Sequence, residues 1–171
     1  SSAQRLRTRN SLRAVRRRQR VGLERLEHRL LLTACPGGSE PIAGDYNLSE
    51  ATVPLEISVP ICYQGSINID VDQPITINAE VISTTGAINL TSTQSLTINQ
   101  AITSDEDGIT LDTDEAITIG ATLQAAGGIE VTSHKAIDVS ADILSSGGEI
   151  TLEAVHKRLN FGISALDQIQ D

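Results

Sequence analysis

The fold is decided by the stretch Gly86-Ala87-Ile88-Asn89-Leu90-Thr91-Ser92-Thr93-Gln94-Ser95-Leu96-Thr97-Ile98-Asn99-Gln100-Ala101-Ile102-Thr103. Aliphatic and polar side chains alternate in three short runs, which is typical of half-buried β-strands. Polar residues separate the runs and provide the turns. Because Ile, Leu and Thr dominate the runs and favour pleated surfaces over helices, this stretch predicts three short strands joined by tight turns.

The same pattern recurs every 20 or 21 residues from Ser66 to Thr151. Three ladders of aliphatic residues keep this period: Ile67, Ile88, Ile109, Ile129 and Ile150; Ile77, Ile98, Ile119 and Val139; Val81, Ile102, Leu123 and Ile143. Self-similarity at such a period is the signature of stacked supersecondary units. A single unit buries too little apolar surface to fold alone, so the units must stabilise one another.

We therefore predict an all-β chain folded as a right-handed parallel β-helix, with three short strands per coil of about 21 residues. Each strand would pair with its equivalent one coil further on, about 4.8 Å away. The alternative is an antiparallel sandwich, which also has short strands and frequent turns. A sandwich gives no reason for all three ladders to keep one period.

The chain divides into four segments by composition. Residues 1–34 form an Arg-rich segment, 35–64 a linker and capping strand, 65–155 the β-helix repeats, and 156–171 a degenerate coil or the start of the next segment. Alternating apolar residues predict one strand over 53–61 that covers the first coil. The sequence reads as the N-terminal portion of a longer protein.

Charge separates the first segment from the rest. Residues 1–34 contain ten arginines and two glutamates, a net charge of +8, whereas the remainder contains three basic and 20 acidic residues, a net charge of −17. We expect the basic segment to be a disordered or helical tail. Nucleic-acid binding through its arginines is one alternative, but the acidic body disfavours it and no nucleic-acid partner is expected. No run of 18 apolar residues is present, so no transmembrane span is expected.

The basic segment carries a specific motif. In Leu26-Glu27-His28-Arg29-Leu30-Leu31-Leu32, the residues Leu26, Glu27, Arg29, Leu31 and Leu32 resemble the LEPR-XLL segment, with His28 where that family has Pro. The family consists of very large bacterial surface and extracellular proteins. The resemblance implies export, with these five residues as a possible sorting motif.

The repeats carry a second resemblance. Gly-x-Ile-x-Leu, Leu/Ile-Thr-Ile and Ala-x-Ile recur over about 65–152, and this pattern is similar to the haemagglutinin-like β-helical regions of large bacterial adhesins. It implies a structural or adhesive module without catalysis, secreted or at the bacterial cell surface. The implied partners are further coils of the same longer chain and cell-surface or matrix components. A glycan-active β-helical enzyme with its site outside this sequence is the alternative.

The sequence contains few candidates for catalytic or metal-binding residues. Catalytic sites need clustered acids and bases, whereas the outward positions are mostly Thr, Ser and Asn, and His134 and Lys135 read as a solvent-facing turn. We expect no catalytic residue and no cofactor. Carboxylates around one turn are weak Ca²⁺ candidates, although they match no known calcium-loop spacing: Asp105, Asp107, Asp112 and Asp114.

Three further expectations concern structure. Cys35 and Cys62 form a disulfide if the protein is exported; free thiols, or lipidation of Cys35 after Leu32-Thr33-Ala34, are the alternatives. Asn78 and Asn99 occupy equivalent places in successive coils and are expected to hydrogen-bond along the axis. The glycine that begins each coil is expected to supply a turn with positive φ.

Overall fold

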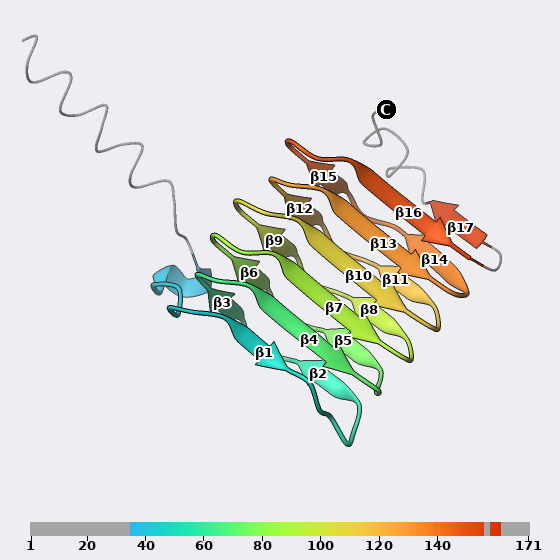
Figure 1. Ribbon diagram of the computed structural model, residues 1–171, viewed down its shortest axis with the longest axis horizontal. Coiled ribbons are helices and arrows are strands. Elements are labelled where there is room, and N and C mark those ends of the chain that lie inside the picture. Colours follow the sequence, from blue (N-terminus) through green and yellow to red (C-terminus); the bar gives the residue numbers. More distant parts are fainter. Residues whose placement is uncertain (1–34, 156–157, 162–171) are drawn as a thin grey trace, which may run out of the picture. The chain divides into compact units, whose positions relative to one another are not determined.

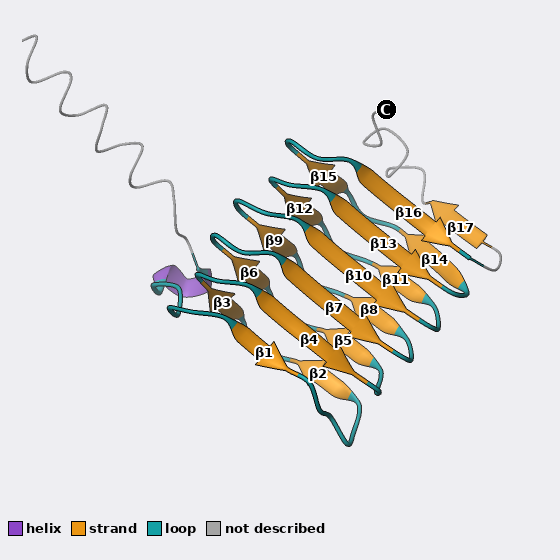
Figure 2. Cartoon of the chain, viewed as in Figure 1, coloured by secondary structure: helices purple, strands orange, loops and turns teal. Residues whose placement is uncertain are grey.

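The computed structural model describes residues 35–155 and 158–161, with side chains through residue 155. These residues form a β-solenoid in which each coil contributes three short strands, so that equivalent strands lie side by side (Figure 1). Figure 2 shows the strands joined by turns and loops, and the single helical piece in the described residues is the 3₁₀ turn η1 (Pro36–Gly38). Every strand pairing is parallel, which excludes the antiparallel sandwich.

Each of the three sheets takes one strand from each coil. Sheet I comprises β1 (Tyr46–Leu48), β4 (Ile67–Val71), β7 (Ile88–Ser92), β10 (Ile109–Thr113), β13 (Ile129–Ser133) and β16 (Ile150–Ala154). Sheet II comprises β2 (Leu55–Ile57), β5 (Ile75–Ile77), β8 (Leu96–Ile98), β11 (Ile117–Ile119), β14 (Ala136–Val139) and β17 (Arg158–Phe161). Sheet III comprises β3 (Ile61–Tyr63), β6 (Val81–Ser83), β9 (Ile102–Ser104), β12 (Leu123–Ala125) and β15 (Ile143–Ser145).

The three aliphatic ladders form the core. Each ladder residue pairs in register with its counterpart one coil away, as Ile88 does with Ile67 and Ile109. The ladder residues of the middle coils are almost completely inaccessible to solvent. Alternation along each strand then directs the intervening polar residues outward. The prediction of three strands per coil and of these ladders is confirmed.

The first coil differs from its prediction. The alternating segment 53–61 is not one strand but two, β2 and β3, separated by a corner at Ser58–Pro60. Val53 and Val59 consequently lie outside the core and are 65% and 71% exposed. The chain turns a corner here because Leu55 and Ile57 pair with β5 whereas Ile61 pairs with β6. Those two strands belong to different sheets, so one continuous strand could not pair with both. Together with β1, these strands complete a full coil ahead of the first recognised repeat.

The prediction of positive φ at the coil-starting glycines is wrong. Among the described residues, positive φ occurs at Gly37, Gly38 and Gly44, which precede the repeats. At Gly86 the constraint is space, because a Cβ there would lie 2.4 Å from the Ser66 nitrogen of the adjacent coil. The same holds at Gly148, where a Cβ would lie 2.2 Å from the Gly128 nitrogen. Glycine is therefore required where the backbones of neighbouring coils come close together.

The last described strand continues the stack. Although Arg158–Phe161 departs from the repeat in composition, it pairs in parallel with β14, with Leu159 opposite Ile137 and Phe161 opposite Val139. Sheet II thus extends one strand beyond sheet III.

Candidate functional site

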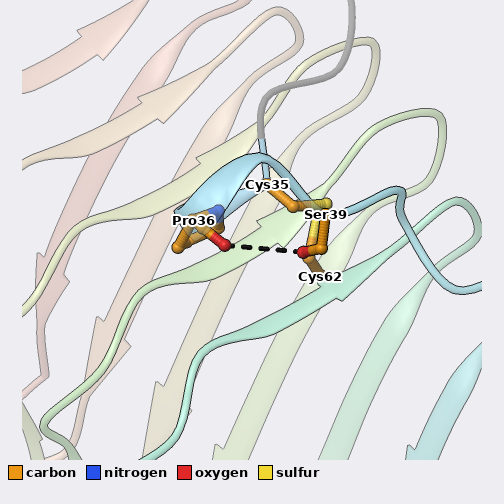
Figure 3. The surroundings of a disulfide bond; sticks show 4 residues. All are labelled: Cys35, Pro36, Ser39 and Cys62. Carbon is orange, nitrogen blue, oxygen red and sulfur yellow. Dashed lines mark hydrogen bonds between the residues drawn. A yellow bond between two sulfur atoms is a disulfide. The ribbon is translucent and has the colours of Figure 1, made fainter.

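A disulfide joins the beginning of the described chain to the first coil. The Cys35 and Cys62 Cα atoms are 5.8 Å apart, and both side chains are buried (Figure 3). Cys62 is the central residue of β3 and pairs with Ile82, whose neighbours Val81 and Ser83 face the core. Cys62 therefore projects from the outer face of sheet III, and the bond holds Cys35 and the 3₁₀ turn η1 against that face.

The edge of sheet III beside β3 is covered as well. The Ile42 N–H donates to the Cys62 carbonyl at 2.9 Å, and the Gln64 N–H donates to the Ile42 carbonyl at 2.8 Å. Ile42 itself is 57% exposed. Inside the same coil, the Tyr46 and Tyr63 rings pack against each other with their centroids 5.3 Å apart.

The four calcium candidates are not brought together. Asp105 and Asp107 lie in the turn before β10, whereas Asp112 lies near the end of β10 and Asp114 just beyond it. Asp107 and Asp112 are five positions apart along an extended chain, a span of about 16 Å, whereas Ca²⁺ ligands lie within about 2.6 Å of the ion. In residues 35–155, no group of three His, Cys, Asp or Glu residues is placed to hold a metal ion.

The local partners of these carboxylates are part of the turns themselves. The Asp107 carboxylate accepts the Gly108 N–H at 2.8 Å. The pKa of Asp105 is raised above its ordinary value of 3.8. The larger cause is partial desolvation of the Asp105 carboxyl group, and the smaller is repulsion from the Glu106 carboxylate.

The turn containing His134 and Lys135 is bound to the turn one coil earlier. His134 Nδ1 lies 2.9 Å from Asp114 Oδ1, and the Lys135 ammonium contacts the Glu115 carboxylate. All four side chains are roughly half exposed. Ion pairs in such positions are screened by water and contribute at most about 1 kcal/mol each. Their arrangement along the axis indicates a role in linking coils.

Asparagine side chains form two ladders on the outer surface. In the predicted one, Asn99 Nδ2 donates to Asn78 Oδ1 at 2.8 Å, and Asn78 Nδ2 donates to Glu56 Oε1 at 2.8 Å. A second ladder on sheet I was not predicted: Asn89 Nδ2 donates to Asn68 Oδ1, and Asn68 Nδ2 donates to Asn47 Oδ1, both at 2.8 Å. The 21-residue spacing of its members is visible in the sequence, but Asn47 precedes the first recognised repeat.

Serine hydroxyls, buried or partly buried, link the corners of successive coils, and these too were missed. The hydroxyls of Ser83, Ser104 and Ser145 donate to the carbonyls of Gly65, Gly86 and Gly127, at 2.7, 3.0 and 2.7 Å. At another corner, the Ser92 hydroxyl donates to the Gln73 carbonyl at 2.7 Å. Each bond satisfies a polar side chain while fixing the path of a turn. Their signal in the sequence is the recurrence of Ser at the last position of a strand.

The possible sorting motif, Leu26, Glu27, Arg29, Leu31 and Leu32, lies outside the described residues. Within residues 35–155 and 158–161, no helical stretch has the length and apolar character that a membrane crossing requires. No protein-family model, no curated protein and no solved structure matches this chain. The function is therefore inferred from the fold and the surface of the molecule.

Proposed function

We propose that this chain is a non-catalytic structural or adhesive module of a large exported bacterial surface protein. The observation that carries the proposal is the constant register of the three parallel sheets, which stacks the coils into a continuous core. Such a stack is stabilised by contacts between neighbouring coils and has no need of a distant partner. It suits a module that holds the neighbouring parts of a longer protein at a fixed distance from each other.

The disulfide supports export. Bonds such as that between Cys35 and Cys62 persist in oxidising compartments and are rare in the reducing cytosol. Here the bond joins the chain that follows residue 34 to the first coil. It therefore keeps the segment before β1 attached to the first coil.

The adhesive part of the proposal is supported by the outer face of sheet I. Two columns of polar residues follow the axis there, with a spacing of about 4.8 Å between coils. The first column is Asn47, Asn68, Asn89, Thr110, Glu130 and Thr151, and the second is Asp70, Thr91, Asp112, Thr132 and Glu153. A regular array of donors and acceptors suits weak, repeated contacts with cell-surface or matrix polymers.

Further coils of the same chain are the proposed structural partner. Among the strands of residues 35–155 and 158–161, β15, β16 and β17 each have a neighbour on one side at the end of the stack. Ile150, Leu152 and Ala154 of β16 are only half-buried. An added coil would pair with these edges and complete the burial of these side chains.

Cell fractionation tests the proposal. Native cells are separated into cytoplasm, envelope and medium, and each fraction is probed with an antibody raised against residues 65–150 after alkylation of free thiols. We expect a band far above 18.2 kDa in the envelope or medium, with Cys35 and Cys62 protected from alkylation. A cytoplasmic band near 18.2 kDa with both thiols alkylated would overturn it.

A further inference from the structure

Two stretches of sheet I have the Asn-x-Ser/Thr sequence of an N-glycosylation acceptor: Asn47-Leu48-Ser49 and Asn89-Leu90-Thr91. Both asparagines belong to the same ladder, two coils apart. The structure makes them unequal, because Asn47 is at the end of the ladder and Asn89 is within the sheet. We infer that Asn47 is a glycan attachment site and that Asn89 is excluded from modification by the fold.

Asn47 is the last asparagine of the ladder, and its amide nitrogen donates no hydrogen bond to another described residue. Asn47 Oδ1 accepts the Asn68 amide at 2.8 Å, whereas Asn47 Nδ2 has no hydrogen-bond acceptor among the described residues. In N-glycosylation it is this nitrogen that reacts, while the carbonyl oxygen keeps its acceptor role. A sugar on Asn47 would therefore leave its hydrogen bond with Asn68 intact.

The surroundings of Asn47 also leave it accessible. The strand β1 is three residues long, and among the described strands it pairs with β4 alone, at the edge of sheet I (Figure 1). Asn47 is exposed, and Ser49, which supplies the required hydroxyl, is exposed and lies beyond the end of the strand. A short edge strand can open locally at low cost, so a transferase can bind this segment in an extended or turned form.

Asn89 offers none of these features. The acceptor sequence Asn89-Leu90-Thr91 lies entirely inside β7, which pairs with β4 on one side and β10 on the other. Leu90 is completely buried. Asn89 Nδ2 donates to Asn68 Oδ1 at 2.8 Å, so this nitrogen is already held against the neighbouring coil inside the sheet. Modification there would require the middle of the solenoid to unfold.

The chemistry requires a sugar donor and a transferase from the host. Asn47 Nδ2 forms a bond to the anomeric carbon of a sugar, while the bond between that carbon and a phosphate oxygen of a sugar pyrophosphate donor breaks. The pyrophosphate leaves with the bonding electrons, and the proton released from Nδ2 passes to a base of the transferase. No oxidation or reduction takes place, and the product is an N-linked glycan.

A glycan at Asn47 also has a structural consequence. Unpaired strand edges promote association between molecules, and proteins block them in several ways. At the beginning of this solenoid, Ile42 covers the edge of sheet III, and Pro54 immediately before β2 limits pairing at the edge of sheet II. The edge of sheet I is β1, which contains Asn47. The glycan would shield that edge.

The inference rests on the proposed export, and the test separates the two. The full chain is isolated from fractionated native cells, reduced and cleaved after glutamate. Because the bond between Glu40 and Pro41 resists this cleavage, Asn47 is released in residues 28–50 and Asn89 in residues 81–106. Mass spectrometry of both peptides is compared for the wild type and for the variants Ser49→Ala, Ser49→Thr and Thr91→Ala. Ser49→Ala removes the acceptor hydroxyl while leaving Asn47 and its ladder in place.

We expect a sugar mass on residues 28–50 of the wild type, retained in Ser49→Thr and Thr91→Ala, lost in Ser49→Ala, and absent from residues 81–106. An unmodified 28–50 peptide from surface-located protein overturns the inference and leaves the proposed function standing. A modified 28–50 peptide from cytoplasmic protein supports the inference and overturns export. Equal modification of both peptides shows that the fold does not select between them and overturns the inference, and unmodified cytoplasmic protein overturns both proposals.

Discussion

Leu48 and Leu90 occupy the same column of sheet I, yet Leu90 is completely buried while Leu48 is only half-buried. Leu90 has a coil on each side, whereas Leu48 belongs to the first coil and has a neighbour on one side. In the middle coils, stacked aliphatic side chains and repeated hydrogen bonds suffice to hold the chain. The first coil adds a disulfide, a tyrosine pair and the bridging residue Ile42. A terminal coil therefore replaces the missing neighbour with contacts that the repeat does not contain.

The largest effect is expected from removing a leucine in the middle. Leu90→Ala should lower the free energy of unfolding by about 2–5 kcal/mol, because it leaves a cavity in a close-packed core. Leu48→Ala, the matched change in the first coil, should cost less than half as much because part of the side chain is already in water. Urea denaturation followed by circular dichroism measures both. Equal losses would show that the first coil is as tightly packed as the middle.

Removing the disulfide should affect the first coil selectively. The Cys35→Ser, Cys62→Ser double variant opens a loop closed over a sequence separation of 27, a change that costs about 3 kcal/mol. Hydrogen exchange at residues 46–63 should accelerate while exchange in β7 to β11 stays nearly unchanged. A reducing agent should reproduce the effect in the wild type and do nothing further to the variant. Uniform acceleration along the chain would contradict the distinction between the two regions.

Substitutions at two glycines compare the cost of crowding between coils with the cost of backbone strain. Gly86→Ala should destabilise the protein by about 3 kcal/mol, because the new Cβ would be 2.4 Å from the Ser66 nitrogen and the coils would have to separate. Gly44→Ala should cost about 1 kcal/mol, since Gly44 has a φ of +95° but open space around it. Thermal unfolding of both variants provides the comparison, and the reverse order would contradict the importance of close approach between coils.

The smallest effect concerns the acidic turn of the middle coils. The pKa of Asp105 is raised in the folded protein, so its folded form binds a proton more tightly than its unfolded form. Any stabilisation from this group is therefore present below the ordinary pKa of 3.8 and is lost as the pH rises through the higher folded value. Asp105→Asn should be slightly more stable than the wild type at pH 7, with the difference vanishing near pH 3. Melting temperatures across that range test the sign, and Asp114→Asn is a control at a turn where the carboxylate contacts His134.

Much of the fold could be predicted because the ladders are periodic. Ile88 and Ile109 must share an environment if each coil repeats the last, so spacing alone predicted their pairing and the parallel sheets. The outward Asn78–Asn99 contact followed from the same spacing. The Ser83 and Ser104 hydroxyl bonds did not, because nothing in a strand's own sequence tells which carbonyl of the preceding coil its last side chain will reach.

What the sequence determined by itself is the coil: its length, its three strands and the side chains that face inward, since these depend on a pattern along one dimension. The tertiary structure decided how the pattern ends. Segment 53–61 alternates like one strand but turns a corner, because Leu55 and Ile61 each pair with a strand of a different sheet. Likewise, Asn47 and Asn89 carry the same acceptor sequence, and only the number of neighbouring strands, one for β1 and two for β7, makes one accessible and the other closed.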